Sequence, residues 1–225
     1  MLKTIGRIIT ETAHAIKEAV TNSIKFIIEF TREVMKELFD SDICKYHSIS
    51  DYSKQEQAYL NQIITLMERH FPDGRIGESL ATLEPVDRAG VVSEFTRELL
   101  DMLQLQNVKV EISYELPATT MGCYYFSEEK IEINGAYLAA LDPVVLREVI
   151  DTVIHETRHA MQLKALSGDN VYGFTDQQLK EWIFNLEHPI DGKRNFYAYR
   201  TQAIEVEAFD YASVTIKEFE GRIKA

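Results

Sequence analysis

Residues 153–161 are Val153-Ile154-His155-Glu156-Thr157-Arg158-His159-Ala160-Met161, and they lie within a segment predicted to form one buried helix. Asp142 and Pro143 mark its start, because an N-cap aspartate accepts a hydrogen bond and proline loses nothing at the first helical position. From residue 144 to 166, apolar side chains cover most of the helix surface. A helix that is apolar nearly all round lies inside a domain, so two imidazoles on it need a polar partner.

The spacing of the two histidines predicts a metal site. Residues four apart project from the same helix face, so His155 and His159 can hold one cation between them. Neutral imidazoles suit Zn²⁺, and an open coordination position leaves room for a water whose pKa the metal lowers to about 7. Glu156 lies beside this axis, where it would act as a general base on that water. The alternative is a chance match in which both imidazoles are ordinary core residues.

A helix over residues 199–212 offers a third ligand. Glu205, Ala208 and Ala212 share one face by their spacing, and a buried glutamate is costly unless it is paired or binds a metal. The small alanines would let this helix approach the histidine helix closely. We therefore expect Glu205 to be the third ligand. Two alternatives are that Glu205 forms a salt bridge with an arginine such as Arg158, and that Glu207 is the third ligand instead.

The segment before the histidine helix is predicted to form strands. Apolar residues alternate with polar ones from Val108 to Tyr114, the period of a half-buried strand. Residues 122–126 and 131–134, joined by a polar turn, are predicted to form a hairpin. An edge of this sheet beside the metal could bind an extended peptide as an added strand, or it could be an ordinary edge.

Helices are predicted on both sides of this central part. Residues 2–39 have an amphipathic helical pattern with a break near residues 21–23, suited to packing on the domain, to a partner or to self-association. Capping boxes at Ser53 and Thr175 each open a helix, and Pro85 begins another, with Val86 expected to be buried. His188 follows the helix after Thr175 and could reach the cleft as a hydrogen-bond donor.

Composition excludes several classes of function. The chain has 225 residues and a net charge of −12, which argues against binding to nucleic acid or to an anionic membrane surface. No apolar run is long enough for a signal peptide or a transmembrane helix, so we expect a cytoplasmic protein. The two cysteines, Cys44 and Cys123, are far apart and suit a reducing compartment.

The motifs together resemble the gluzincin clan of zinc metallopeptidases. The resemblance rests on His155-Glu156-x-x-His159 and a later Glu205-x-x-Ala208, and it is closer to small bacterial zincin-like domains such as those of polymorphic toxins. The further matches are Gly122, Tyr124, Ile131, Ile133 and Asn134, then Ala160 and Gln162, then Tyr199 and Gln202. This chain departs from the pattern at two positions, where Ala203 replaces Pro and Glu207 replaces Asp. In peptidase families with Glu-x-x-Ala-Asp, an Asp follows the Ala, whereas this chain has Phe209 at that position.

We therefore predict an α+β fold, with a helical region over residues 1–105 and a zincin-like domain over 106–225. The expected function is zinc-dependent hydrolysis of a protein or peptide substrate, with His155, His159 and Glu205 as ligands and Glu156 as base. Tyr199 or Tyr197 would stabilise developing negative charge. The alternative is a non-catalytic interaction module whose metal site is structural or unused.

Overall fold

The computed structural model describes residues 44–192 and 194–223, which form an α+β fold as predicted. The predicted helix over residues 2–39 lies outside this part of the chain. In chain order the elements are η1 (Ile49–Asp51), α2 (Lys54–His70), α3 (Ile76–Ala81), α4 (Pro85–Met102), β1 (Lys109–Ser113), β2 (Gly122–Tyr125), β3 (Lys130–Asn134), α5 (Gly135–Leu138), α6 (Pro143–Leu166), α7 (Asp176–Glu187), α8 (Phe196–Arg200) and α9 (Ala203–Ile223).

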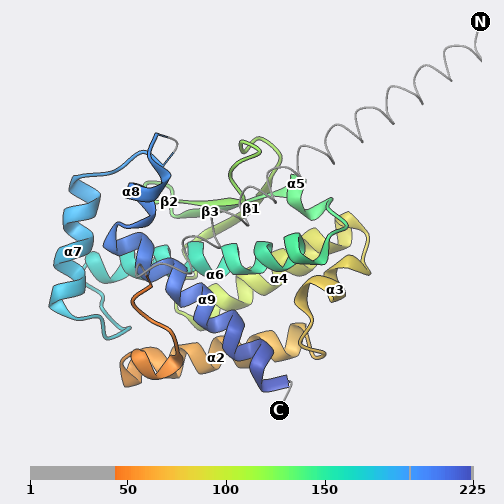
Figure 1. The fold of residues 1–225 in the computed structure, drawn as a ribbon, viewed down its shortest axis with the longest axis horizontal. Helices are drawn as coiled ribbons and strands as arrows, with labels where there is room; N and C mark the ends of the chain where they lie inside the picture. Colours follow the sequence, from red (N-terminus) through yellow and green to blue (C-terminus); the bar gives the residue numbers. More distant parts are fainter. Residues whose placement is uncertain (1–43, 193, 224–225) are drawn as a thin grey trace, which may run out of the picture. The chain divides into compact units, whose positions relative to one another are not determined.

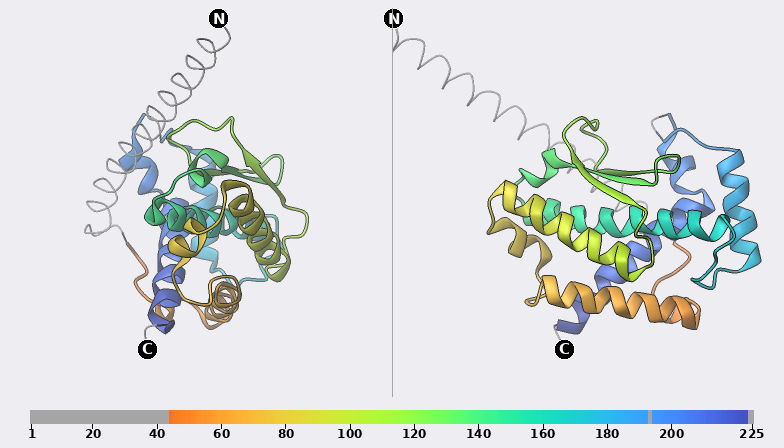
Figure 2. Two further views of the ribbon diagram at one scale, coloured as in Figure 1. Left: turned by 90° about the vertical axis from the view of Figure 1, so that its right-hand side faces the viewer. Right: turned by 180° about the vertical axis from the view of Figure 1, so that it is seen from behind.

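The histidine helix α6 lies at the centre of the fold. Its start is as predicted, since the Asp142 side chain accepts from the amide of Val144 at 2.9 Å and Pro143 follows. The small sheet lies on one side of α6 and α2 on the other, with α9 and α4 on opposite flanks (Figures 1 and 2). A Cβ on Gly77 of α3 would lie 1.8 Å from the carbonyl oxygen of Pro143, so α3 crosses the start of α6 at a distance that only glycine permits.

The sheet has the strand order β1-β3-β2 within the described residues. β2 and β3 form the predicted antiparallel hairpin, and β1 runs parallel to β3 with Val110 opposite Ile131. Strand β2 is therefore an edge strand, and it packs on α6. A Cβ on Gly122 would come within 2.6 Å of the Thr152 side chain, so this glycine allows the edge strand to approach the histidine helix closely.

The N-terminal helices pack against the same core as α6. Ser53 and Glu56 form the predicted capping box of α2, and α2 packs on α4 and α9. The compact unit that begins at Asp42 extends to the end of the chain, across the expected boundary between residues 105 and 106. Val86 is 77% exposed, so the prediction that it is buried was wrong.

The last predicted helix is divided in two. The chain leaves helical geometry between Arg200 and Ala203, which separates α8 from α9. Asn195 caps α8, and the side chain of Asn185 on α7 accepts a hydrogen bond from the amide of Ile204 at 3.1 Å. The break is therefore stabilised by a residue 19 positions away in the sequence.

None of the helices in the part of the chain described above is both long and apolar enough to cross a membrane.

Candidate metal centre

The two imidazoles face each other on the buried side of α6. His155 and His159 are 6% and 5% exposed, and their Nε2 atoms are 3.0 Å apart. The ring of Phe209 on α9 packs on His155, with ring centroids 4.2 Å apart. Both predicted histidine ligands therefore direct the same ring nitrogen towards one buried point.

Glu205 on α9 completes this cluster. Its Oε2 atom lies 3.5 Å from the Nε2 atom of each histidine. Ala208 and Ala212 are fully buried on α9, which packs along α6 as their small size predicts. Among the described residues, α9 thus brings a carboxylate to the two imidazoles.

The cluster fits a cation. Glu205 Oε2 is buried without a hydrogen-bond partner, and so is Nδ1 of His155. A buried acceptor without a partner is costly, and a metal ion between the three side chains would remove that cost. Tetrahedral zinc, with bonds of about 2.0–2.2 Å to nitrogen and oxygen, places its ligand atoms roughly 3.3–3.5 Å apart. The two N···O separations match this spacing, and the imidazoles need only a small outward shift.

Charge in the metal-free cluster is balanced between Glu205 and the histidines. Burial opposes the imidazolium form of His159, but the carboxylate of Glu205 outweighs it and raises the pKa of His159 to about 9. Burial likewise opposes the ionised form of Glu205, but His159 and His155 hold the pKa of its carboxyl well below its usual range. A metal ion would therefore replace a proton at this position.

Glu156 lies beside the cluster and is held by the edge strand. Its Oε2 atom accepts a hydrogen bond from the backbone amide of Tyr124 on β2 at 2.8 Å. Its Oε1 atom lies 4.0 Å from Nε2 of His155. The carboxylate of Glu156 also falls within 4.8 Å of ligand atoms on both histidines. Because β2 already engages one of its oxygens, Glu156 is better suited to contact a water than to replace Glu205 as a ligand.

Glu207, the rival third ligand, is occupied elsewhere. Its carboxylate accepts from Nε of Arg158 at 2.9 Å to each oxygen and from the side-chain amide of Gln162 at 2.7 Å. Arg158 also donates to Glu56 of α2 at 2.6 Å. Arg158, which was the alternative partner predicted for Glu205, is therefore bound to two other carboxylates.

The tyrosines and His188 differ in their relation to the cluster. Burial, followed by the negative charges of Glu205 and Glu156, raises the pKa of Tyr199. Tyr197 is 62% exposed, which favours Tyr199 of the two candidates. His188 is exposed, and its Nδ1 atom lies 2.9 Å from the carbonyl oxygen of Phe184. The turn after α7 therefore uses His188 as a helix cap.

Two residues near the cluster had no predicted role there. Cys123 on β2 is a free thiol whose pKa is raised to about 11 by burial and then by the charges of Glu156 and Glu132. The ring of Phe126 lies 6.3 Å from that of His159. Along β2, Cys123 alternates with Gly122 and Tyr124, whose positions face the core, so it shares the opposite face of the sheet with Glu132. The influence of Glu156 on its pKa depends on how β2 packs beside α6, which the sequence alone does not show.

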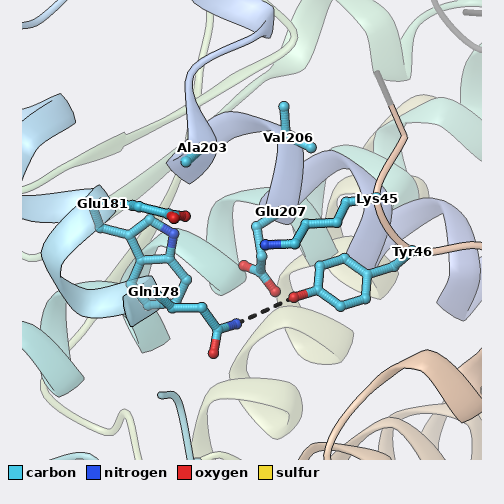
Figure 3. Close-up of a pocket in the computed structure, with 8 residues that line it drawn as sticks. Lys45, Tyr46, Gln178, Glu181, Ala203, Val206 and Glu207 are labelled. Carbon is cyan, nitrogen blue, oxygen red and sulfur yellow. Dashed lines mark hydrogen bonds between the residues drawn. The ribbon is translucent and has the colours of Figure 1, made fainter. Parts of the chain in front are cut away.

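A separate cavity of about 240 Å³ lies between the segment at residues 45–46, α7 and α9 (Figure 3). Its lining includes Tyr46, Gln178, Trp182 and Glu207, and the amide of Gln178 lies 3.4 Å from the hydroxyl of Tyr46. Glu207 therefore belongs both to this cavity and to the ion pair with Arg158.

Comparisons with models of known protein families, with curated proteins and with solved structures found no match for this chain.

Proposed function

We propose that the protein is a zinc-dependent endopeptidase, with His155, His159 and Glu205 as ligands. The observation that carries this proposal is the convergence of two imidazole nitrogens on a buried carboxylate oxygen that lacks a hydrogen bond. Two nitrogens and one carboxylate oxygen are the donor set of many catalytic zinc sites. Zinc bound there would polarise a substrate carbonyl and lower the pKa of a water to about 7.

Three surrounding residues support peptide hydrolysis as the reaction. Glu156 would accept the proton of the attacking water and pass it to the leaving amine. The amide of Tyr124 orients this carboxylate by binding one oxygen and leaving the other towards the cluster. Tyr199 stays protonated because its pKa is raised, so its hydroxyl can donate to the oxygen on which negative charge develops.

The edge strand supports an extended protein or peptide substrate. β2 pairs only with β3 among the described strands, and the Tyr124 amide that binds Glu156 points away from β3. A substrate strand laid along this edge would bring its peptide bond beside Glu156 and the metal ligands. The net charge of −12 favours a neutral or basic protein over nucleic acid or an anionic membrane. Two free thiols are compatible with action in the cytoplasm.

A structural metal site is the competing function, and it would serve a non-catalytic interaction module. Such a site is closed by a fourth protein ligand, whereas a catalytic one keeps a position open to water. Glu156 is the nearest candidate for closing the site, at 4.0 Å from His155 Nε2. Its bond to the Tyr124 amide favours the catalytic reading.

One experiment separates these functions. Purified protein reconstituted with zinc should hold about one metal ion per chain, His159→Ala should lose it, and Glu156→Gln should keep it. New protein termini should appear in a proteome treated with wild type or with the control Glu148→Gln, but not with Glu156→Gln. Absence of bound metal, or cleavage that persists in Glu156→Gln, would refute the proposal. Zinc binding without any cleavage would establish the structural alternative.

A further inference from the structure

Gln162 connects the histidine helix α6 to the buried ion pair between Arg158 and Glu207. It lies three residues after His159 on α6 and is fully buried. Its Oε1 atom is 2.8 Å from Nδ1 of His159. Its Nε2 atom lies 2.7 Å from Glu207 and 3.1 Å from the carbonyl oxygen of Ile204. One side chain thus joins an imidazole of the candidate metal centre to α9.

The surroundings of Gln162 leave its amide one orientation. A carboxylate and a backbone carbonyl can only accept hydrogen bonds, so the NH₂ group of Gln162 must face Glu207 and Ile204. A flipped amide would place its carbonyl oxygen against two acceptors. The Oε1 atom is therefore directed to His159, where it can only accept from an Nδ1–H group.

This orientation determines which nitrogen of His159 can bind a metal. With the proton fixed on Nδ1, the neutral imidazole carries its lone pair on Nε2, the atom that faces His155 and Glu205. We infer that Gln162 is a positioning residue that sets the metal-binding tautomer of His159 and is itself oriented by Glu207. This inference rests on the proposed zinc site and adds the side chain that prepares one of its ligands.

The two ligand histidines are not equivalent in this respect. Nδ1 of His155 is buried without a partner, whereas Nδ1 of His159 has Gln162. Arg158 donates to both oxygens of Glu207, one of which also accepts from Gln162, and Arg158 is held in turn by Glu56 of α2. The orientation of His159 therefore depends on contacts that extend from α6 through α9 to α2.

The test compares zinc affinities measured by competition with a chromogenic chelator. Gln162→Met keeps the volume of the side chain but removes the acceptor, so affinity should fall 10–100-fold. The matched control is Gln178→Met, another buried, hydrogen-bonded glutamine, which caps α7 and does not contact an imidazole. This control should bind zinc as wild type does, and circular dichroism of both variants reports whether they fold.

An exchange of the two side chains gives a second, sharper arm. In the double variant Gln162→Glu with Glu207→Gln, the carboxylate at position 162 still accepts from Nδ1–H of His159. The amide at position 207 donates to it and accepts from Arg158. The carbonyl oxygen of Ile204 loses its donor in this variant, so zinc affinity should rise well above that of Gln162→Met without exceeding that of wild type, since the acceptor for Nδ1–H of His159 is restored. A packing role alone would not predict this recovery.

The outcomes separate this inference from the proposed function. If wild type binds zinc and His159→Ala does not, but Gln162→Met binds as tightly as wild type, the role of Gln162 is refuted and the zinc site stands. If the exchanged variant folds but binds as weakly as Gln162→Met, tautomer control is refuted as the cause. If wild type binds no zinc, both the inference and the proposed function are wrong.

Discussion

Replacing Arg158 by methionine should destabilise the protein far more than an ordinary arginine replacement. Arg158 is fully buried, and the two carboxylates that it binds, Glu207 and Glu56, are 3% and 4% exposed. Methionine fills a similar volume between the rings of Phe174 and Tyr211, over which the guanidinium is centred at 4.4 and 3.9 Å. The main loss is therefore the positive charge between two buried negative ones.

The size of the effect follows from that burial. Removing one partner of a buried ion pair lowers the free energy of unfolding by about 3–5 kcal/mol, because it leaves an uncompensated charge. At about 2–4 °C per kcal/mol for a unit of this size, the melting temperature should fall by roughly 6–20 °C. The control is Arg147→Met on the same helix, whose ion pairs with Glu148 and Glu220 are partly exposed and contribute about 1 kcal/mol or less.

Urea unfolding followed by circular dichroism, with a chelator present throughout, measures both variants without a contribution from bound metal. Adding Glu56→Gln and Glu207→Gln to Arg158→Met should recover most of the lost stability, because no buried charge remains unpaired. A loss in Arg158→Met no larger than that in Arg147→Met would refute the reasoning. A triple variant as unstable as the single one would show that lost packing, and not charge, is the cause.

Three further predictions concern ligands, pH and packing. Glu205→Ala should weaken zinc binding more than Glu207→Ala, whose effect should be about 10–100-fold; calorimetric titration giving the reverse order would make Glu207 the ligand. In metal-free protein, the raised pKa of His159 contributes stability that is fully present below about pH 6.5 and is lost as the pH rises through about 9. Melting temperatures should therefore fall over that range in wild type, and a fall just as steep in His159→Phe would contradict this. Gly77→Ala should lower the free energy of unfolding by about 1–3 kcal/mol or more, because its Cβ would overlap the backbone at the start of α6. Gly90→Ala has open space around it and should instead stabilise α4 by about 0.4–1 kcal/mol. Equal effects of the two variants on thermal unfolding would argue against the close contact at Gly77.

Local signals in the sequence were sufficient for the strands, for the longer helices α2, α4, α6 and α7, and for the pairing of the two histidines. Ser53 and Thr175 mark the starts of α2 and α7 through capping contacts within four residues, and Asp142 with Pro143 marks the start of α6. The pairing of His155 with His159 is also local, because helical geometry alone brings residues four apart together. Each of these predictions needs no knowledge of how distant segments pack.

The remaining parts of the site depend on contacts between distant segments. Glu205 and Glu207 are both buried on α9, so burial alone could not distinguish the carboxylate beside the two histidines from the one that pairs with Arg158. What distinguishes them is Arg158, 49 residues before Glu207, together with Glu56, 102 residues before Arg158. The division of α8 from α9 likewise depends on Asn185 from another helix. Short α3 and α5 went unpredicted because tertiary contacts stabilise helices of that length.

The tryptophan that lines the cavity beside Glu207 can report on the structure through its fluorescence. Trp182, which lines it, is the only tryptophan in the sequence and is 1% exposed. Its indole packs edge-on against Phe174 at 4.8 Å, and Phe174 in turn covers the guanidinium of Arg158. Emission from this single indole therefore arises next to the ion pair between Arg158 on α6 and Glu207 on α9. If metal binding or unfolding of α7 rearranged that ion pair, the wavelength and intensity of the tryptophan emission would change. This change could be measured without an added label.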